Sequence, residues 1–129
     1  MQELENIGAI TLFVADVERA RQWYQRVFER SPVHEDDQSA VLRFGATLIN
    51  LLAVSEAPEL IAPAAVARAD AGASAQFAIW VDDVDATVAA LEERGVELVN
   101  GPVDRAWGQR TACFADPDGH LWEVAQSIG

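Results

Sequence analysis

The sequence predicts an α+β fold made of two tandem βαβββ modules. Residues 8–20 and 75–87 repeat one pattern, in which an alternating strand is followed by Asp-Val and then by an amphipathic helix. The second copy lies 67 residues after the first, as Asp16 and Asp83 show. More strand-like sequence follows each helix. The 129 residues therefore form one folding unit of two small halves, each too short for a large core of its own.

The first module spans about residues 6–54. Asp16 is expected to cap a helix over residues 17–29, which has apolar residues at helical spacing. The three strands expected after it cover residues 33–36, 40–44 and 47–54. Gly45 and Ala46 form the two-residue turn between the last two strands.

The second module spans about residues 75–127 and follows a linker, residues 55–74, whose Ala-rich middle suits a short helix. Asp83 is expected to cap a helix over residues 84–94, and Gly95 ends it. The strands expected after it cover residues 97–99, 110–115 and 120–127, and residues 116–119, Asp-Pro-Asp-Gly, form the last turn.

Composition excludes several classes of function. The chain has 21 acidic residues against nine basic ones, all Arg, so its net charge of -12 repels nucleic acid and anionic membranes. Without Lys there is no Schiff-base chemistry, and Cys113, the single cysteine, forms no internal disulfide. No secretory signal or membrane-length apolar run is visible, and we expect a soluble cytoplasmic protein. The acidic charge suits solubility first and a cationic ligand second.

Two motifs near the C-terminus carry a family resemblance. Trp107-Gly-Gln-Arg110 is followed by Asp116-Pro-Asp-Gly-His120-Leu-Trp-Glu123. Together with the duplicated βαβββ pattern, over about residues 6–127, they make the chain resemble the vicinal oxygen chelate superfamily, which includes glyoxalase I, extradiol dioxygenases and the bleomycin resistance proteins. The resemblance is greatest to its metal-free, drug-binding branch. It implies curved sheets that form an incomplete barrel around a cleft, and a homodimer.

Strand alternation predicts which side chains face that cleft. The continuous apolar faces, such as Ile10, Leu12 and Val14, should pack on the helices. The opposite faces are mixed in polarity, which suits a ligand site. They contain Ala9, Thr11, Phe13, Leu48, Asn50, Leu52, Gln76, Ala78, Trp80, Leu121, Glu123 and Ala125.

The resemblance also locates a metal quartet, which falls on Ala9, Asn50, Gln76 and Glu123. Ala9 has no donor atom, and Asn50 and Gln76 are weak neutral donors. We therefore expect no cofactor. The minority alternative is a divalent Ni, Zn, Mn or Fe ion held by Gln76 and Glu123.

Aromatic and charged residues complete the expected ligand site. Phe13, Trp80 and Trp107 are candidate stacking walls, although Trp80 and Trp107 fit core filling equally well. If the last hairpin closes around residues 116–119, then Arg110 and Phe114 face the cleft with Glu123, as Arg43 does in the first module. Each Arg could hold a ligand oxygen or neutralise Glu123. Trp23, Trp122 and Cys113 are expected in the core.

Two functions follow, and a third, an accessory domain, stays open. The first is a small-molecule binding protein that sequesters a planar or aromatic ligand, such as an antibiotic, without a metal. The alternative is a lyase or isomerase related to glyoxalase I, with or without a divalent metal. There Glu123 acts as general base, and Gln76 and Arg110 hold the substrate oxygens.

Overall fold

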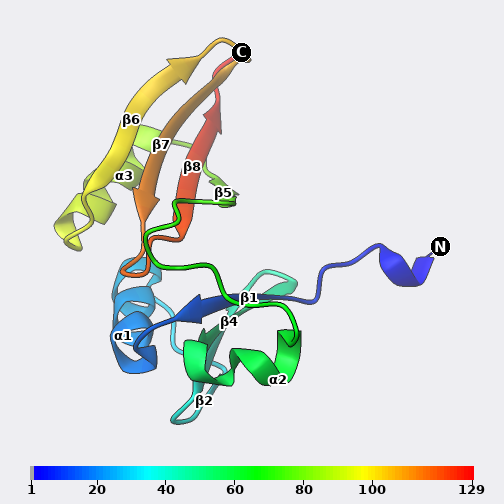
Figure 1. The fold of residues 1–129 in the computed structure, drawn as a ribbon. Coiled ribbons are helices and arrows are strands. Elements are labelled where there is room, and N and C mark those ends of the chain that lie inside the picture. Colours follow the sequence, from blue (N-terminus) through cyan, green and yellow to red (C-terminus); the bar gives the residue numbers. More distant parts are fainter. Residues whose placement is uncertain (1) are drawn as a thin grey trace. The chain divides into compact units, whose positions relative to one another are not determined.

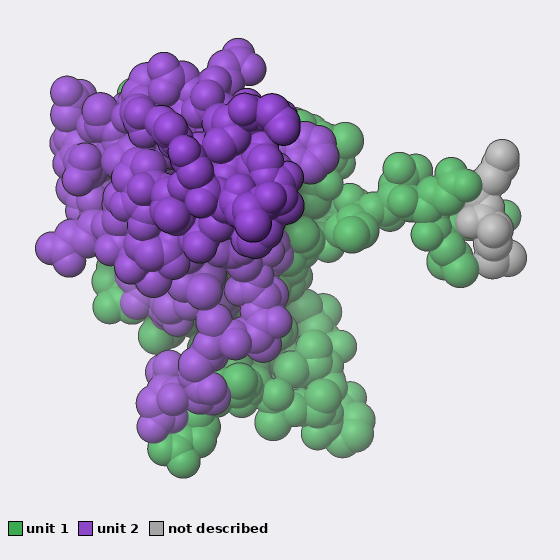
Figure 2. Space-filling model, turned by 90° about the horizontal axis from the view of Figure 1, so that it is seen from above, with its two compact units in different colours: residues 1–68 green, residues 69–129 purple. Residues whose placement is uncertain are grey.

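The computed structural model describes residues 2–129, which divide after Arg68 into two compact units. Figure 2 colours them separately, and each contains one four-stranded sheet (Figure 1). No helix within residues 2–129 is both long enough and apolar enough to cross a bilayer.

Unit 1 has its sheet in the order β1-β4-β3-β2, with β1 parallel to β4 and the other pairs antiparallel. Its elements are the 3-10 helix η1 (Gln2–Leu4), β1 (Ala9–Val14), α1 (Val17–Phe28), β2 (His34–Glu35), β3 (Ser39–Phe44), β4 (Thr47–Ala53), the 3-10 helix η2 (Val54–Glu56) and α2 (Ala57–Ile61).

Unit 2 repeats this arrangement with the sheet order β5-β8-β7-β6, in which β5 is parallel to β8. Its elements are β5 (Gln76–Trp80), α3 (Val84–Glu93), β6 (Leu98–Arg105), β7 (Gln109–Ala115) and β8 (Leu121–Ser127). The predicted α+β class and the two βαβββ modules are therefore confirmed.

The two aspartates cap their helices as the repeat predicts. Asp16 Oδ1 accepts a hydrogen bond from the backbone N–H of Arg19, and Asp83 Oδ1 accepts one from Ala86, both at 3.0 Å. Each carboxylate thereby satisfies a backbone donor that has no partner inside the helix, and it lies at the positive end of the helix dipole.

In each unit the long helix packs on one face of the sheet and does not cover the other face. α1 buries Ala20, Trp23, Tyr24 and Val27, and α3 buries Val84, Val88 and Leu91. Of the strand residues predicted to alternate toward these helices, Ile10, Phe77 and Ile79 are only half-buried. Those that are buried as predicted are Leu12, Val14, Ile49, Leu51, Trp122 and Val124. We call the opposite face of each sheet its open face.

Two elements differ from the sequence prediction. β6 continues to Arg105 instead of stopping at residue 99, because its pairing with β7 resumes after irregularities between Leu98 and Val103. An edge strand tolerates Gly101 and Pro102 in this way. In the expected linker, α2 precedes the Ala-rich stretch.

Candidate functional site

The open face of unit 1 carries three of the predicted ligand residues. Asn50 lies opposite Thr11 of β1 and Val41 of β3, whereas Phe13 lies opposite Leu52. Arg43 lies opposite Leu48, because Phe44 pairs with Thr47 around the expected two-residue turn. Phe13, Arg43 and Asn50 therefore project from one face of one sheet.

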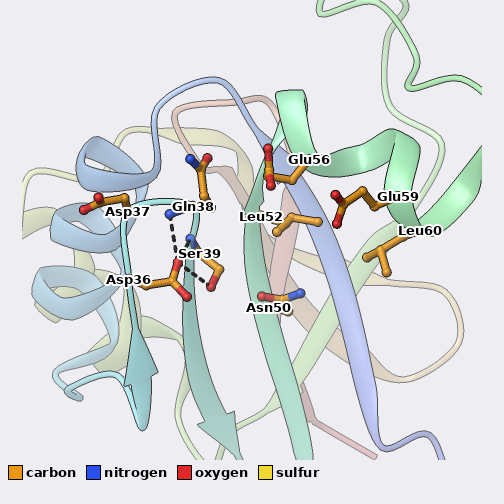
Figure 3. Close-up of a pocket in the computed structure, with 9 residues that line it drawn as sticks. All are labelled: Asp36, Asp37, Gln38, Ser39, Asn50, Leu52, Glu56, Glu59 and Leu60. Atoms are coloured by element: carbon orange, nitrogen blue, oxygen red, sulfur yellow. Dashed lines mark hydrogen bonds between the residues drawn. The ribbon is translucent and has the colours of Figure 1, made fainter.

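A pocket of about 580 Å³ opens on this face. The strands supply its floor through Ser39, Asn50 and Leu52, and α2 places Glu59 and Leu60 beside them (Figure 3). Its lining is Asp36, Asp37, Gln38, Ser39, Asn50, Leu52, Glu56, Glu59 and Leu60. The predicted linker therefore contributes a wall of this pocket through α2.

Asp36 shapes the rim of the pocket. Its Oδ1 accepts hydrogen bonds from the backbone N–H groups of Gln38 at 2.8 Å and Ser39 at 2.9 Å, while His34 Nε2 lies 3.1 Å from its Oδ2. The Gln38 bond first, and then the His34 bond, hold the pKa of this carboxyl below its ordinary value. Asp36 is therefore a fixed anion at neutral pH.

Asn50 has an unused acceptor. Its Nδ2 donates to Thr11 Oγ1 at 3.4 Å, whereas its Oδ1 is buried without a hydrogen-bond partner among the residues described. Leaving a buried carbonyl unpaired costs about 1–3 kcal/mol. A ligand N–H or O–H would satisfy it.

The open face of unit 2 brings Gln76, Trp80 and Glu123 to one side of its sheet. Glu123 lies opposite Ala78 on β5 and opposite Cys113 on β7, and Trp80 lies opposite Ala125. The small Ala78 and Cys113 side chains leave the half-buried Glu123 carboxylate accessible beside them. Gln76 Nε2 donates to Cys113 Sγ at 3.5 Å, so this buried thiol belongs to the open face.

The predicted facing of Arg110 and Phe114 is wrong. Ala115 pairs with Leu121, so three residues, 117–119, form the tip of the hairpin, and Asp116 N–H donates to the carbonyl of His120 at 2.9 Å. The register therefore shifts by one residue from the four-residue turn expected from the sequence. Phe114 then lies opposite Trp122 in the core, on the face of the sheet that α3 covers.

Arg110 lies on that helix-covered face as well, opposite Gln126. Its Nε donates to Asp104 Oδ1 at 2.7 Å, and its Nη1 donates to Asp85 of α3 at 2.9 Å. The guanidinium holds the pKa of Asp104 below its ordinary value, and Asp104 raises the pKa of Arg110. Arg110 therefore joins α3 to the β6–β7 hairpin and does not share a face with Glu123.

A different arginine, Arg105, occupies the open face. Its Nε donates to Thr111 Oγ1 at 3.0 Å, and Thr111 shares a row across the sheet with Ala125 and Trp80. Trp107 follows in the turn, with its ring centroid 6.0 Å from Arg105 Cζ. The Trp107 Nε1–H donates to Gln109 Oε1 at 3.0 Å. Sequence reasoning missed Arg105 because strand β6 was expected to end before it.

The four tryptophans divide into two classes. Trp23 and Trp122 are 9% and 2% exposed, as expected of core residues, whereas Trp80 is 83% exposed and Trp107 is 68% exposed. Large exposed apolar side chains on one side of a sheet can mark an interaction surface. This decides against core filling for Trp80 and Trp107.

The resemblance assigns a metal quartet to Ala9, Asn50, Gln76 and Glu123, and only Glu123 among them carries a charged donor. Ala9 has no donor, and Asn50 and Gln76 offer only neutral amides. Within residues 2–129, no three His, Cys, Asp or Glu side chains form a group able to hold a metal ion.

Comparison with known proteins identifies the family of the chain. A sequence profile of the Glyoxalase/Bleomycin resistance protein/Dioxygenase superfamily matches residues 6–124. The chain belongs to this superfamily. The match includes both modules, and it confirms the resemblance that the duplicated pattern and the C-terminal motifs indicate.

Single proteins also match the chain over most of its length. The uncharacterized protein YraH of Bacillus subtilis is 31% identical in an alignment 124 positions long, which covers 92% of this chain and 96% of YraH. A glyoxalase-related enzyme from Fulvimarina pelagi has a TM-score of 0.81 at 23% identity, covering 96% of this chain and 89% of that one. A superfamily protein from Nocardioides has a TM-score of 0.85 at 21% identity, covering 95% and 83%. At these identities the two structures establish the fold alone.

Proposed function

We propose that this member of the superfamily is a metal-free binding protein that sequesters a planar or aromatic small molecule. The observation that carries the proposal is the pair of exposed indoles, Trp80 and Trp107, on one open face. Stacking on such rings recognises planar ligands through dispersion and quadrupole interactions, and it needs no metal. The donor-poor quartet supports the metal-free part of the proposal.

The polar residues of the same face give orientation to a stacked ligand. The Glu123 carboxylate accepts a hydrogen bond, and the Gln76 amide can accept one through its oxygen while its Nε2 donates to Cys113. A few placed polar groups in a largely apolar site are typical of ligand recognition. An antibiotic with a planar ring system is one ligand of this class.

A Trp107→Ala variant tests the binding proposal, with neutral 2-naphthamide as a planar probe in titration calorimetry. We expect the affinity to fall about two- to tenfold, because stacking on one aromatic ring contributes about 0.5–1.5 kcal/mol. The matched control is Val33→Ala, which removes an exposed apolar side chain from unit 1 and should leave the affinity unchanged. Equal affinity of the wild type and Trp107→Ala would reject the stacking role.

The second candidate is a glyoxalase-like lyase or isomerase with Glu123 as general base. The half-buried carboxylate and its small neighbours, Ala78 and Cys113, favour it, because a substrate C–H could approach the oxygens there. A glyoxalase assay of the purified protein separates the two candidates. We expect no turnover above background, with or without added Ni²⁺ or Zn²⁺. Turnover that Glu123→Gln abolishes, while naphthamide binding is retained, would establish the enzyme instead.

A further inference from the structure

Arg105 is held in a fixed position on the open face of unit 2 by neutral partners. Its Nε donates to Thr111 Oγ1 at 3.0 Å, and its Nη2 donates to Asn100 Oδ1 at 3.4 Å. Two anchor points define the plane of the guanidinium. The side chain is therefore already oriented before any ligand arrives.

Arg105 has no ion-pair partner among residues 2–129. No carboxylate of the described residues lies within 4.0 Å of its guanidinium, although the chain has 21 acidic residues for nine arginines. Arg110, on the opposite face, pairs with both Asp85 and Asp104, and Arg21 pairs with Glu18 and Glu35. The half-buried Arg105 guanidinium therefore has only neutral partners, the Trp107 ring among them, and an anionic group of a ligand would supply the missing opposite charge.

The unused donors of Arg105 have the geometry of an oxyacid site. A guanidinium has five N–H groups, and Thr111 and Asn100 accept from only two of them. Nη1, with both its hydrogens, and the second hydrogen of Nη2 keep no protein acceptor among residues 2–129. Parallel N–H groups of this kind bind the two oxygens of a carboxylate in a bidentate arrangement. The Trp107 ring beside Arg105 would stack on the body of the same ligand.

We propose that the ligand is a planar aromatic acid, whose carboxylate or similar oxyanion binds Arg105 while its ring stacks on Trp107. This inference rests on the proposed function, and it names the ligand class of the same site. It differs from the expectation, based on net charge, that a cation is favoured. Salt screens the charge of the whole chain over about 8 Å, whereas a direct guanidinium contact is much shorter.

The test compares two probes of nearly identical shape, 2-naphthoate and 2-naphthamide, by titration calorimetry at pH 7.5. For the wild type we expect naphthoate to bind about three- to tenfold more tightly, because only the acid pairs a negative charge with the guanidinium in its hydrogen bonds. In Arg105→Gln we expect this preference to disappear, so that the two probes bind with equal affinity. Arg110→Gln is the matched control, since it removes an arginine from the opposite face and should keep the preference.

Each outcome separates the inference from the proposed function. If the wild type binds both probes equally, or if the preference survives in Arg105→Gln, the assignment to Arg105 is wrong although planar ligands still bind. If Arg110→Gln abolishes the preference instead, Arg110 is the anion site. If neither probe binds the wild type, the proposed function fails, and the inference fails with it.

Discussion

Phe114→Ala is expected to lower the free energy of unfolding by about 3–5 kcal/mol, because it removes a fully buried aromatic ring and leaves a cavity. Phe114 lies in the core opposite Trp122 on β8, on the helix-covered face. Its loss should destabilise unit 2. Urea denaturation followed by circular dichroism measures the change.

The control for this variant is Trp80→Ala, which removes a larger ring from the open face of the same sheet. Because Trp80 is mostly exposed, its replacement should change the unfolding free energy by less than about 0.5 kcal/mol. Had Phe114 lined the ligand site, as the sequence suggested, both variants would be equally mild. A Phe114→Ala protein as stable as the wild type would show that the β7–β8 register is wrong.

Gly101→Ala is the second substitution with a large expected effect. Gly101 has φ of +87°, and a Cβ there would overlap the carbonyl oxygen of Thr111 and lie 2.7 Å from Ala112 Cα. Both contacts are with the backbone of β7, which cannot turn aside as a flexible side chain can. The left-handed backbone and the overpacking together should lower the free energy of unfolding by about 2–5 kcal/mol, as measured by urea denaturation.

Gly119→Ala separates the two causes. Gly119 also has a positive φ, +86°, but a Cβ there would meet nothing within 4 Å. In this variant the free energy of unfolding should fall by only about 1–2 kcal/mol, because only the left-handed backbone is unfavourable for alanine there. Equal losses at both positions would contradict the close approach of β6 to β7. That approach also positions Asn100, which orients Arg105.

Periodicity and capping were sufficient to predict the fold from the sequence. The Asp-Val pairs start both helices, and the apolar faces of β1 and β8 are buried as alternation predicts. These features depend on local chemistry and on a period of two or 3.6 residues. The length of β6 could not be predicted, because its continuation past Gly101 depends on pairing with β7.

The candidate site was only partly predictable, because the register between β7 and β8 depends on the exact length of the turn that joins them. One residue in the β7–β8 turn decides whether Phe114 and Arg110 or Cys113 and Thr111 share the face of Glu123. Asp116 Oδ1 accepts from the backbone N–H groups of Asp118 and His120, and it draws His120 into the turn. Single-sequence reasoning treated residues 116–119 as the whole turn. Arg105 had no sequence signal of its own, and the short helix expected in the linker was placed in its Ala-rich middle, whereas α2 lies before that stretch.

The most direct test of the central claim is the NMR spectrum of the four indole N–H groups during titration with 2-naphthamide. A planar ligand on the open face of unit 2 should shift the Trp80 and Trp107 signals by ring-current effects. Signals from the buried Trp23 and Trp122 should stay in place. Saturable shifts confined to the two exposed indoles are the predicted result. Shifts of neither indole at millimolar probe would contradict the binding function.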